Sequence, residues 1–97
     1  MRESVFEQAL RKKIKALGGI SYKWVSPGQD GVPDRICVFP GGAVVFMEVK
    51  RPGVKDGRSA QQKKVQAVLE KMGCCVFRVG DKGDFEKMME AVNAKNL

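Results

Sequence analysis

Two apolar segments joined by a Pro-Gly-Gly turn constrain the fold of this chain more than any other feature. Residues 36–39 read Ile-Cys-Val-Phe, residues 43–50 begin Ala-Val-Val-Phe-Met, and only three residues stand between the two segments. Short apolar runs are typical of strands, and a glycine-rich turn of this length joins neighbouring antiparallel strands. We therefore predict a β-hairpin that brings Asp34, at the start of one strand, beside Glu48 and Lys50, at the end of the other.

The segments around this hairpin alternate between helical and strand patterns. The predicted elements are a helix at 3–17, strands at 20–24, 36–39 and 43–50, a helix from a Ser59–Gln62 capping box to Gly73, a strand at 74–79, and a helix from Asp84, as its N-cap, to about Asn93. The order α-β-β-β-α-β-α predicts an α/β fold. No repeat or linker interrupts it, so we expect residues 1–97 to form a single domain.

Net charge indicates a polyanionic partner. Eighteen lysines and arginines stand against 11 aspartates and glutamates, which gives a formal charge of +7. A basic surface of this kind favours nucleic acid. No apolar run approaches the roughly 20 residues that cross a bilayer, so no membrane association is expected. Met1-Arg2 opens directly into a charged segment, so we predict no secretory signal and expect a cytoplasmic protein.

The residues that are missing restrict the chemistry. The chain has no histidine, which excludes Ser-His and Cys-His catalysis and every histidine-ligated metal. Three cysteines, two of them adjacent and none in CxxC spacing, predict neither a disulfide framework nor a zinc site. Any bound metal must therefore be a hard cation held by oxygen atoms, such as Mg²⁺, Mn²⁺ or Ca²⁺.

The open end of the predicted hairpin has the residues that a metal-dependent hydrolase needs. Side chains two apart on a strand share a face, so Glu48 and Lys50 point the same way. With Asp34 beside them, two carboxylates and an ammonium converge, and two nearby carboxylates are tolerated most easily when a divalent cation bridges them. We predict a metal held by Asp34, Glu48 and the carbonyl of Val49, with Lys50 acting on a water or on the transition-state charge.

A third acid is expected from the first helix. At about 100° per residue Glu3 falls between Leu10 and Ile14 on the apolar face, whereas Glu7 lies further toward the polar side. We therefore favour Glu3. Glu7 has the alternative role of an ion-pair partner for Arg11, four residues further along the helix.

The motifs of this chain, taken together, resemble those of a known family. They are Glu3, Gly18-Gly19, Ser26-Pro27-Gly28, Gly31-Val32-Pro33-Asp34-Arg35, Pro40-Gly41-Gly42, Glu48-Val49-Lys50-x-Pro52-Gly53 and Ser59-x-x-Gln62. In order and spacing they are similar to the virus-type replication-repair nuclease (VRR-NUC) domain of the PD-(D/E)xK nuclease superfamily. This resemblance implies a restriction-endonuclease-like core, with a mixed central sheet flanked by helices.

The resemblance also implies roles for individual residues. It points to Asp34, Glu48 and the Val49 carbonyl as ligands of Mg²⁺ or Mn²⁺, and to Lys50, Glu3 and Gln62 as catalytic. Gln61 stands beside Gln62, so both glutamines remain candidates to face the site. The small members of the family that this chain resembles are phage or bacterial homodimers that cut branched DNA, including four-way (Holliday) junctions.

Two other functions remain open. One is a general duplex endonuclease or exonuclease of the same superfamily. The other is a basic DNA-binding module without catalysis, in which the acids only stabilise the fold.

Overall fold

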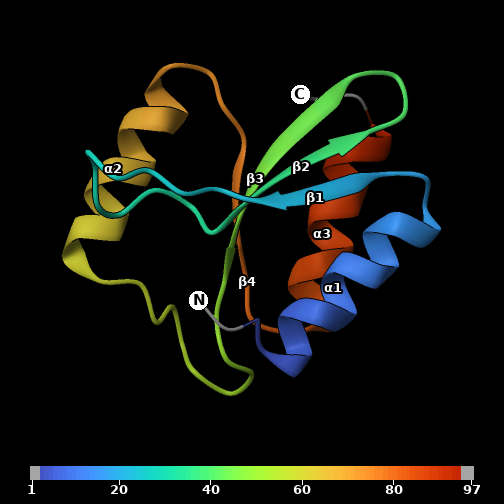
Figure 1. Cartoon of the computed structure of the whole chain (residues 1–97), viewed down its shortest axis with the longest axis horizontal. Helices are drawn as coiled ribbons and strands as arrows, with labels where there is room; N and C mark the ends of the chain where they lie inside the picture. The colour runs from blue at the N-terminus through green and yellow to red at the C-terminus, as the bar shows by residue number, and fades with distance from the viewer. Residues whose placement is uncertain (1–2, 95–97) are drawn as a thin grey trace.

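The computed structural model describes residues 3–94 and has the predicted order of elements. Met1-Arg2, on which the expected lack of a secretory signal rests, lies outside these residues. The elements are α1 (Val5–Ala16), β1 (Ile20–Lys23), β2 (Arg35–Phe39), β3 (Ala43–Val49), α2 (Ala60–Lys71), β4 (Val76–Val79) and α3 (Lys82–Asn93) (Figure 1). Along residues 3–94 no helix is long and apolar enough to span a bilayer.

The four strands form one mixed sheet in the order β1-β2-β3-β4. The predicted hairpin is confirmed: β2 and β3 pair antiparallel from Arg35↔Met47 to Phe39↔Ala43, and the amide of Gly42 closes the turn on the Phe39 carbonyl at 3.0 Å. β1 pairs antiparallel with β2. β4 runs parallel to β3, because the chain returns through α2 before it re-enters the sheet.

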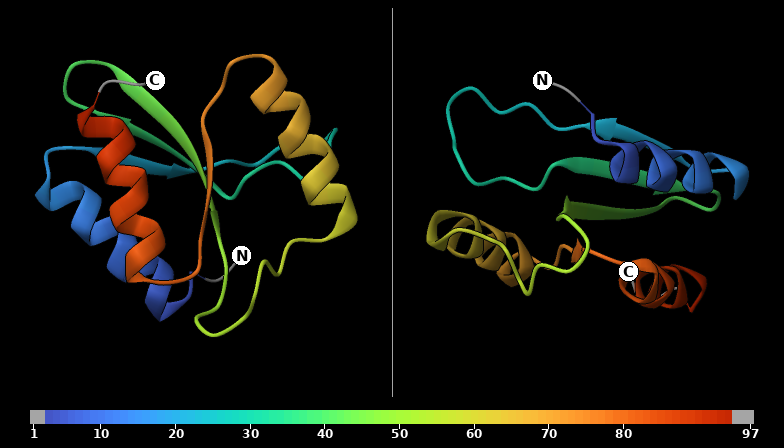
Figure 2. Two further views of the ribbon diagram at one scale, coloured as in Figure 1. Left: turned by 180° about the vertical axis from the view of Figure 1, so that it is seen from behind. Right: turned by 90° about the horizontal axis from the view of Figure 1, so that it is seen from below.

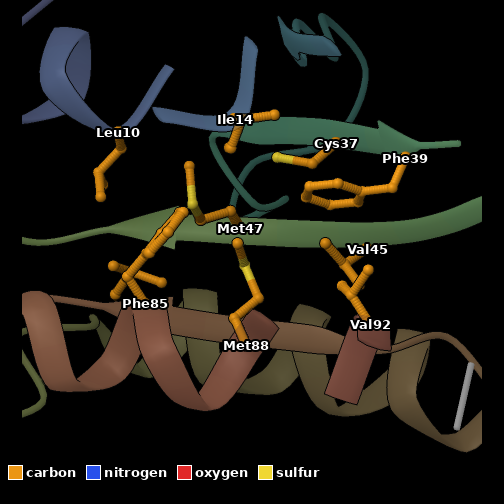
Figure 3. Close-up of a cluster of buried hydrophobic side chains, with 10 residues drawn as sticks. Leu10, Ile14, Cys37, Phe39, Val45, Met47, Phe85, Met88 and Val92 are labelled. Carbon is orange, nitrogen blue, oxygen red and sulfur yellow. The ribbon is translucent and has the colours of Figure 1, made fainter. Parts of the chain in front are cut away.

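The helices lie on both sides of the strands. In Figures 1 and 2, α1 and α3 lie on one side and α2 on the other. The hydrophobic core is formed by α1, α3 and the sheet face that they cover (Figure 3). Its fully or nearly fully buried residues are Leu10, Ile14, Cys37, Phe39, Val45, Met47, Val79, Phe85, Met88 and Val92. Val49 packs against this core, whereas Asp34, Glu48 and Lys50 are not part of it.

The structure corrects several predicted boundaries. α3 begins at Lys82 with Asp81 as its N-cap, not with Asp84 as predicted. Asp81 has extended backbone angles, and its side chain accepts the amide of Asp84 at 2.8 Å. Asp84 lies in the first turn, where its carboxylate instead accepts Gly80 N and an Arg78 guanidinium N–H. β4 begins at Val76 instead of residue 74, and α1 begins at Val5 instead of Glu3.

Candidate active site

Asp34 lies at the open end of the hairpin, directly before β2. Its side-chain Oδ2 accepts the backbone N–H of Val49 at 2.8 Å, and its carbonyl accepts the N–H of Trp24 at 2.8 Å. The first bond joins the start of β2 to the end of β3. The structure thus places Asp34 against residue 49, as the hairpin predicted.

Glu48 is buried on the sheet face that α2 covers. Its side chain is 1% exposed, yet three donors contact it. Lys50 Nζ lies 3.0 Å from Oε2, Gln62 Nε2 donates to Oε2 at 2.8 Å, and Gln66 Nε2 donates to Oε1 at 3.0 Å. Because Glu48 and Lys50 alternate with Val49, both side chains project toward α2 while Val49 faces the opposite side.

Gln62 connects the start of α2 to this charged pair. Its Oε1 accepts both Lys50 Nζ at 3.1 Å and the backbone N–H of Ser59 at 2.9 Å, while Ser59 Oγ accepts Gln62 N at 3.1 Å. The predicted capping box is therefore present, and its glutamine also contacts Glu48 and Lys50. Gln61 is exposed, so the structure brings Gln62, and not its neighbour, to the candidate site.

The two acids near the start of α1 lie in different places. Glu7 lines a cavity of about 520 Å³ together with Asp34, Val49 and Lys50. Glu3 instead pairs with Arg11 at 3.1 Å and Arg35 at 3.0 Å, and the hydrogen bond from Arg11 lowers the pKa of Glu3. Glu7 is joined to the same Arg35 at 2.8 Å.

The preference for Glu3 depended on counting it as helical. Ser4 is the N-cap of α1, so Glu3 precedes the helix and the angle of 100° per residue does not apply to it. Glu7, in the first turn, is the acid that reaches the cavity. Arg11 pairs with Glu3, not with Glu7 as the alternative interpretation expected.

The surroundings of both carboxylates at the hairpin end disfavour the charged form and raise the pKa of each. Burial raises the pKa of Asp34, opposed by the N–H of Val49, and the nearby Glu7 raises it further. Burial also raises the pKa of Glu48, and the charge of Asp34 adds to this, opposed by Lys50 and Gln66. Repulsion between like charges in partly desolvated surroundings is relieved by a bound cation.

The oxygen donors of the candidate site fit a cation whose coordination shell is completed by water and by oxygen atoms of the substrate. Within residues 3–94 no group of three or more acidic, cysteine or histidine side chains is placed to hold a metal ion by itself. Two carboxylates and a backbone carbonyl suffice for Mg²⁺ or Mn²⁺, because Mg²⁺ retains waters and takes further oxygens from a phosphate. Asp34, Glu48 and the Val49 carbonyl would be such a set.

The sequence interpretation assigned no role to two residues that contact the candidate site. Arg35 is 3% exposed and joins Glu3 and Glu7 of the α1 region to Ser21 of β1, through a bond to Ser21 Oγ of 2.7 Å. Gln66 is fully buried against Glu48. One signal was available for Gln66, since residues 62 and 66 are four apart and lie on one face of a helix.

Comparisons with known proteins match the chain in sequence and in fold. No family model matches the sequence. A relative described as "Putative nuclease p44", from Acyrthosiphon pisum secondary endosymbiont phage 1, is 40% identical over 93 residues, covering 96% of this chain and 97% of the relative. A solved structure described as "VRR_NUC domain" has a TM-score of 0.79 and 29% identity, covering 91% of this chain and 94% of the other. The similarity in sequence and in fold therefore extends over nearly the whole chain.

Proposed function

Because this chain belongs to the VRR-NUC family of nucleases and has its restriction-endonuclease-like fold, we propose that it is a Mg²⁺- or Mn²⁺-dependent DNA endonuclease. Its substrates are phosphodiester bonds in branched DNA, such as four-way junctions. The observation that carries the proposal is the convergence of Asp34, Glu48 and Lys50 at the open end of one hairpin, with Gln62 bonded to both Glu48 and Lys50.

Each residue of the site has a role that its contacts support. Asp34, Glu48 and the Val49 carbonyl would hold the cation, which would supply Lewis-acid chemistry by polarising the phosphodiester and acidifying a water. Lys50, held by Glu48 and Gln62, presents an ammonium to the attacking water or to the charge that develops on the phosphate. Glu7 is the acid of α1 that we assign to this cavity in place of Glu3, because it lines the cavity with Asp34 and Lys50.

The basic residues beside the site suit a DNA backbone. Arg51 lines the same cavity as Lys50, and Lys55 is exposed in the loop that follows. Contacts of this kind neutralise phosphates and carry no sequence information. They support a nuclease that recognises DNA shape instead of a particular base sequence.

We propose further that the active form is a homodimer of single-domain chains. Two copies related by a two-fold axis present two sites to two strands, and a four-way junction has the same symmetry. This part of the proposal is supported by the resemblance to small family members that pair on branched DNA.

Cleavage of a labelled four-way junction and a matched linear duplex tests the proposal. Wild-type protein is expected to cut the junction with Mg²⁺ or Mn²⁺ and not with EDTA. Lys50→Ala should lower the rate by about 100-fold or more while junction binding is retained, because the ammonium acts on the reacting groups. Lys64→Ala, which removes an exposed lysine of α2, is the matched control and should cut at a rate near wild type.

Three outcomes would contradict parts of the proposal. Equal cutting of junction and duplex would indicate a general endonuclease. Normal cutting by Lys50→Ala would show that the site is wrongly assigned. Tight junction binding without cutting in any metal would indicate a DNA-binding module without catalysis.

A further inference from the structure

Gln66 is a buried polar residue at a position where a helix usually has an apolar side chain. It is 0% exposed and is the buried residue of α2. Burying an amide costs free energy unless its donors and acceptor are paired. A leucine here would cover the sheet without that cost, so the amide itself requires an explanation.

The contacts of Gln66 fix the direction of its amide. Nε2 donates to Glu48 Oε1 at 3.0 Å and to the Gly31 carbonyl at 3.5 Å, while Oε1 accepts Arg58 Nη1 at 3.2 Å. A guanidinium only donates and an ionised carboxylate only accepts, so the oxygen must face Arg58 and the nitrogen must face Glu48. The amide of Gln66 thus lies between the Arg58 guanidinium and the Glu48 carboxylate and is hydrogen-bonded to both.

Arg58 is itself held in place by Asp56. Two parallel bonds join them, Nε to Oδ1 at 2.6 Å and Nη2 to Oδ2 at 2.9 Å, and Asp56 Oδ1 also accepts the backbone N–H of Arg58 at 3.2 Å. The carbonyl of Asp56 accepts Arg78 Nε at 2.7 Å, and Arg78 pairs with Asp84 at 2.8 Å. A continuous series of contacts therefore runs from the first turn of α3 to Glu48.

Glu48 has different partners on its two oxygens. Oε2 receives Lys50, which we assign to the reaction, and Gln62, which also holds Lys50, whereas Oε1 receives Gln66. Partners outside the ligand shell orient metal ligands and tune their affinity. A neutral amide suits that role, because it fixes the carboxylate while leaving its negative charge available to a cation.

We infer that Gln66 is a positioning residue that fixes the Glu48 carboxylate for divalent-cation binding, and that the Asp56–Arg58 pair acts through it. The inference rests on the proposed function only in taking Glu48 as a metal ligand. According to this inference, residues in the interior of α2 and in the loop before it help to set the affinity of the site for the metal.

Titration calorimetry with Mn²⁺, without DNA, tests the inference. Gln66→Leu should bind Mn²⁺ about 10- to 100-fold more weakly than wild type, which is the usual effect of removing such a partner. Gln61→Leu makes the same chemical change at an exposed site on the same helix and should bind as wild type does. In junction cleavage, Gln66→Leu should need more Mn²⁺ for half-maximal rate and recover most of the rate at saturating Mn²⁺.

A second variant keeps the test decisive if Gln66→Leu does not fold. Asp56→Asn changes a partly exposed residue and weakens the hold on Arg58, so it should weaken Mn²⁺ binding by a smaller factor. Asp30→Asn, which removes an exposed carboxylate outside this series of contacts, controls for loss of charge. If Arg58 acts through Gln66, the double variant Gln66→Leu/Asp56→Asn should bind no more weakly than Gln66→Leu alone.

The results separate this inference from the proposed function. Wild-type Mn²⁺ affinity in a folded Gln66→Leu protein, or in Asp56→Asn if that is the variant that folds, would overturn the inference and leave the nuclease proposal intact. Wild-type protein that binds no Mn²⁺ and cuts no DNA in any metal would overturn both. Added loss in the double variant would show that Asp56 acts by another route.

Discussion

Asp34, which we propose as a metal ligand, is unfavourable for the stability of the fold when no metal is bound. Its carboxyl is partly buried, and Glu7 lies in the same cavity, so its pKa is raised above the ordinary value. A raised carboxyl pKa costs no stability at low pH, where both folded and unfolded chains are protonated. As pH rises through the folded-state pKa the cost develops, and above that pKa it is fully present.

We therefore expect that replacing Asp34 with an uncharged residue stabilises the metal-free protein. Asp34→Asn keeps an oxygen that can accept the Val49 N–H and removes the charge, so at pH 7.5 in EDTA its melting temperature should rise by a few degrees. Mn²⁺ at 100 times its Kd should stabilise wild type by about 2.7 kcal/mol and the variant far less. Thermal melts at both conditions measure this, and a lower melting temperature for the variant in EDTA would contradict it.

Most of the candidate site could be predicted at the residue scale because it follows from strand alternation and one hairpin. Glu48, Lys50 and Asp34 converge for that reason alone. Glu3 and Glu7 could not be separated, because the choice depends on where the first turn of α1 begins. An N-cap at Ser4 moves Glu3 out of the helix.

At the scale of elements, Gly31 allows the loop before β2 to lie against α2. Its φ of +92° is unfavourable for residues with a side chain, and a Cβ built there would lie 2.8 Å from the Gln61 carbonyl oxygen and 3.1 Å from Val65 Cγ2. The carbonyl of Gly31 also accepts from Gln66. The glycine of the Gly-Val-Pro-Asp motif therefore has a packing role next to the site.

We expect Gly31→Ala to destabilise the protein by about 2 kcal/mol or more, because it combines a positive φ with a contact to backbone atoms. Gly28→Ala, in the same loop but at a position where a Cβ would meet no atom within 4 Å, should change stability little. Urea denaturation of both variants gives the comparison. Equal midpoints would show that the loop can move away from α2 without cost.

The order of the helices and strands could be predicted from the sequence. The residues at which they begin and end, and the contacts between elements, were harder to predict. Capping signals located α2 correctly at Ser59, but two aspartates near the start of α3 could each serve as N-cap. Arg78 and the amide of Gly80 engage Asp84, which leaves Asp81 to cap the helix. That choice depends on a contact with β4, which no local pattern contains.

At the scale of the whole molecule, the proposed dimer should be measurable. Sedimentation equilibrium at micromolar concentration should give twice the mass of one chain, and one junction should bind one dimer. A single-chain mass both alone and on the junction would contradict the homodimer. The Lys50→Ala protein is a suitable sample for the bound state, because it should bind the junction without cutting it.

The sequence by itself determined the order of elements, the hairpin and the convergence of Asp34, Glu48 and Lys50, because these depend on short-range periodicity and one tight turn. Only the tertiary structure decided that Glu7 replaces Glu3 at the cavity, that Arg35 joins β1, β2 and the α1 region, and that Gln66 contacts Glu48. These contacts join residues 14 to 32 positions apart. Their partners are chosen by the packing of helices on the sheet, which local pattern does not specify.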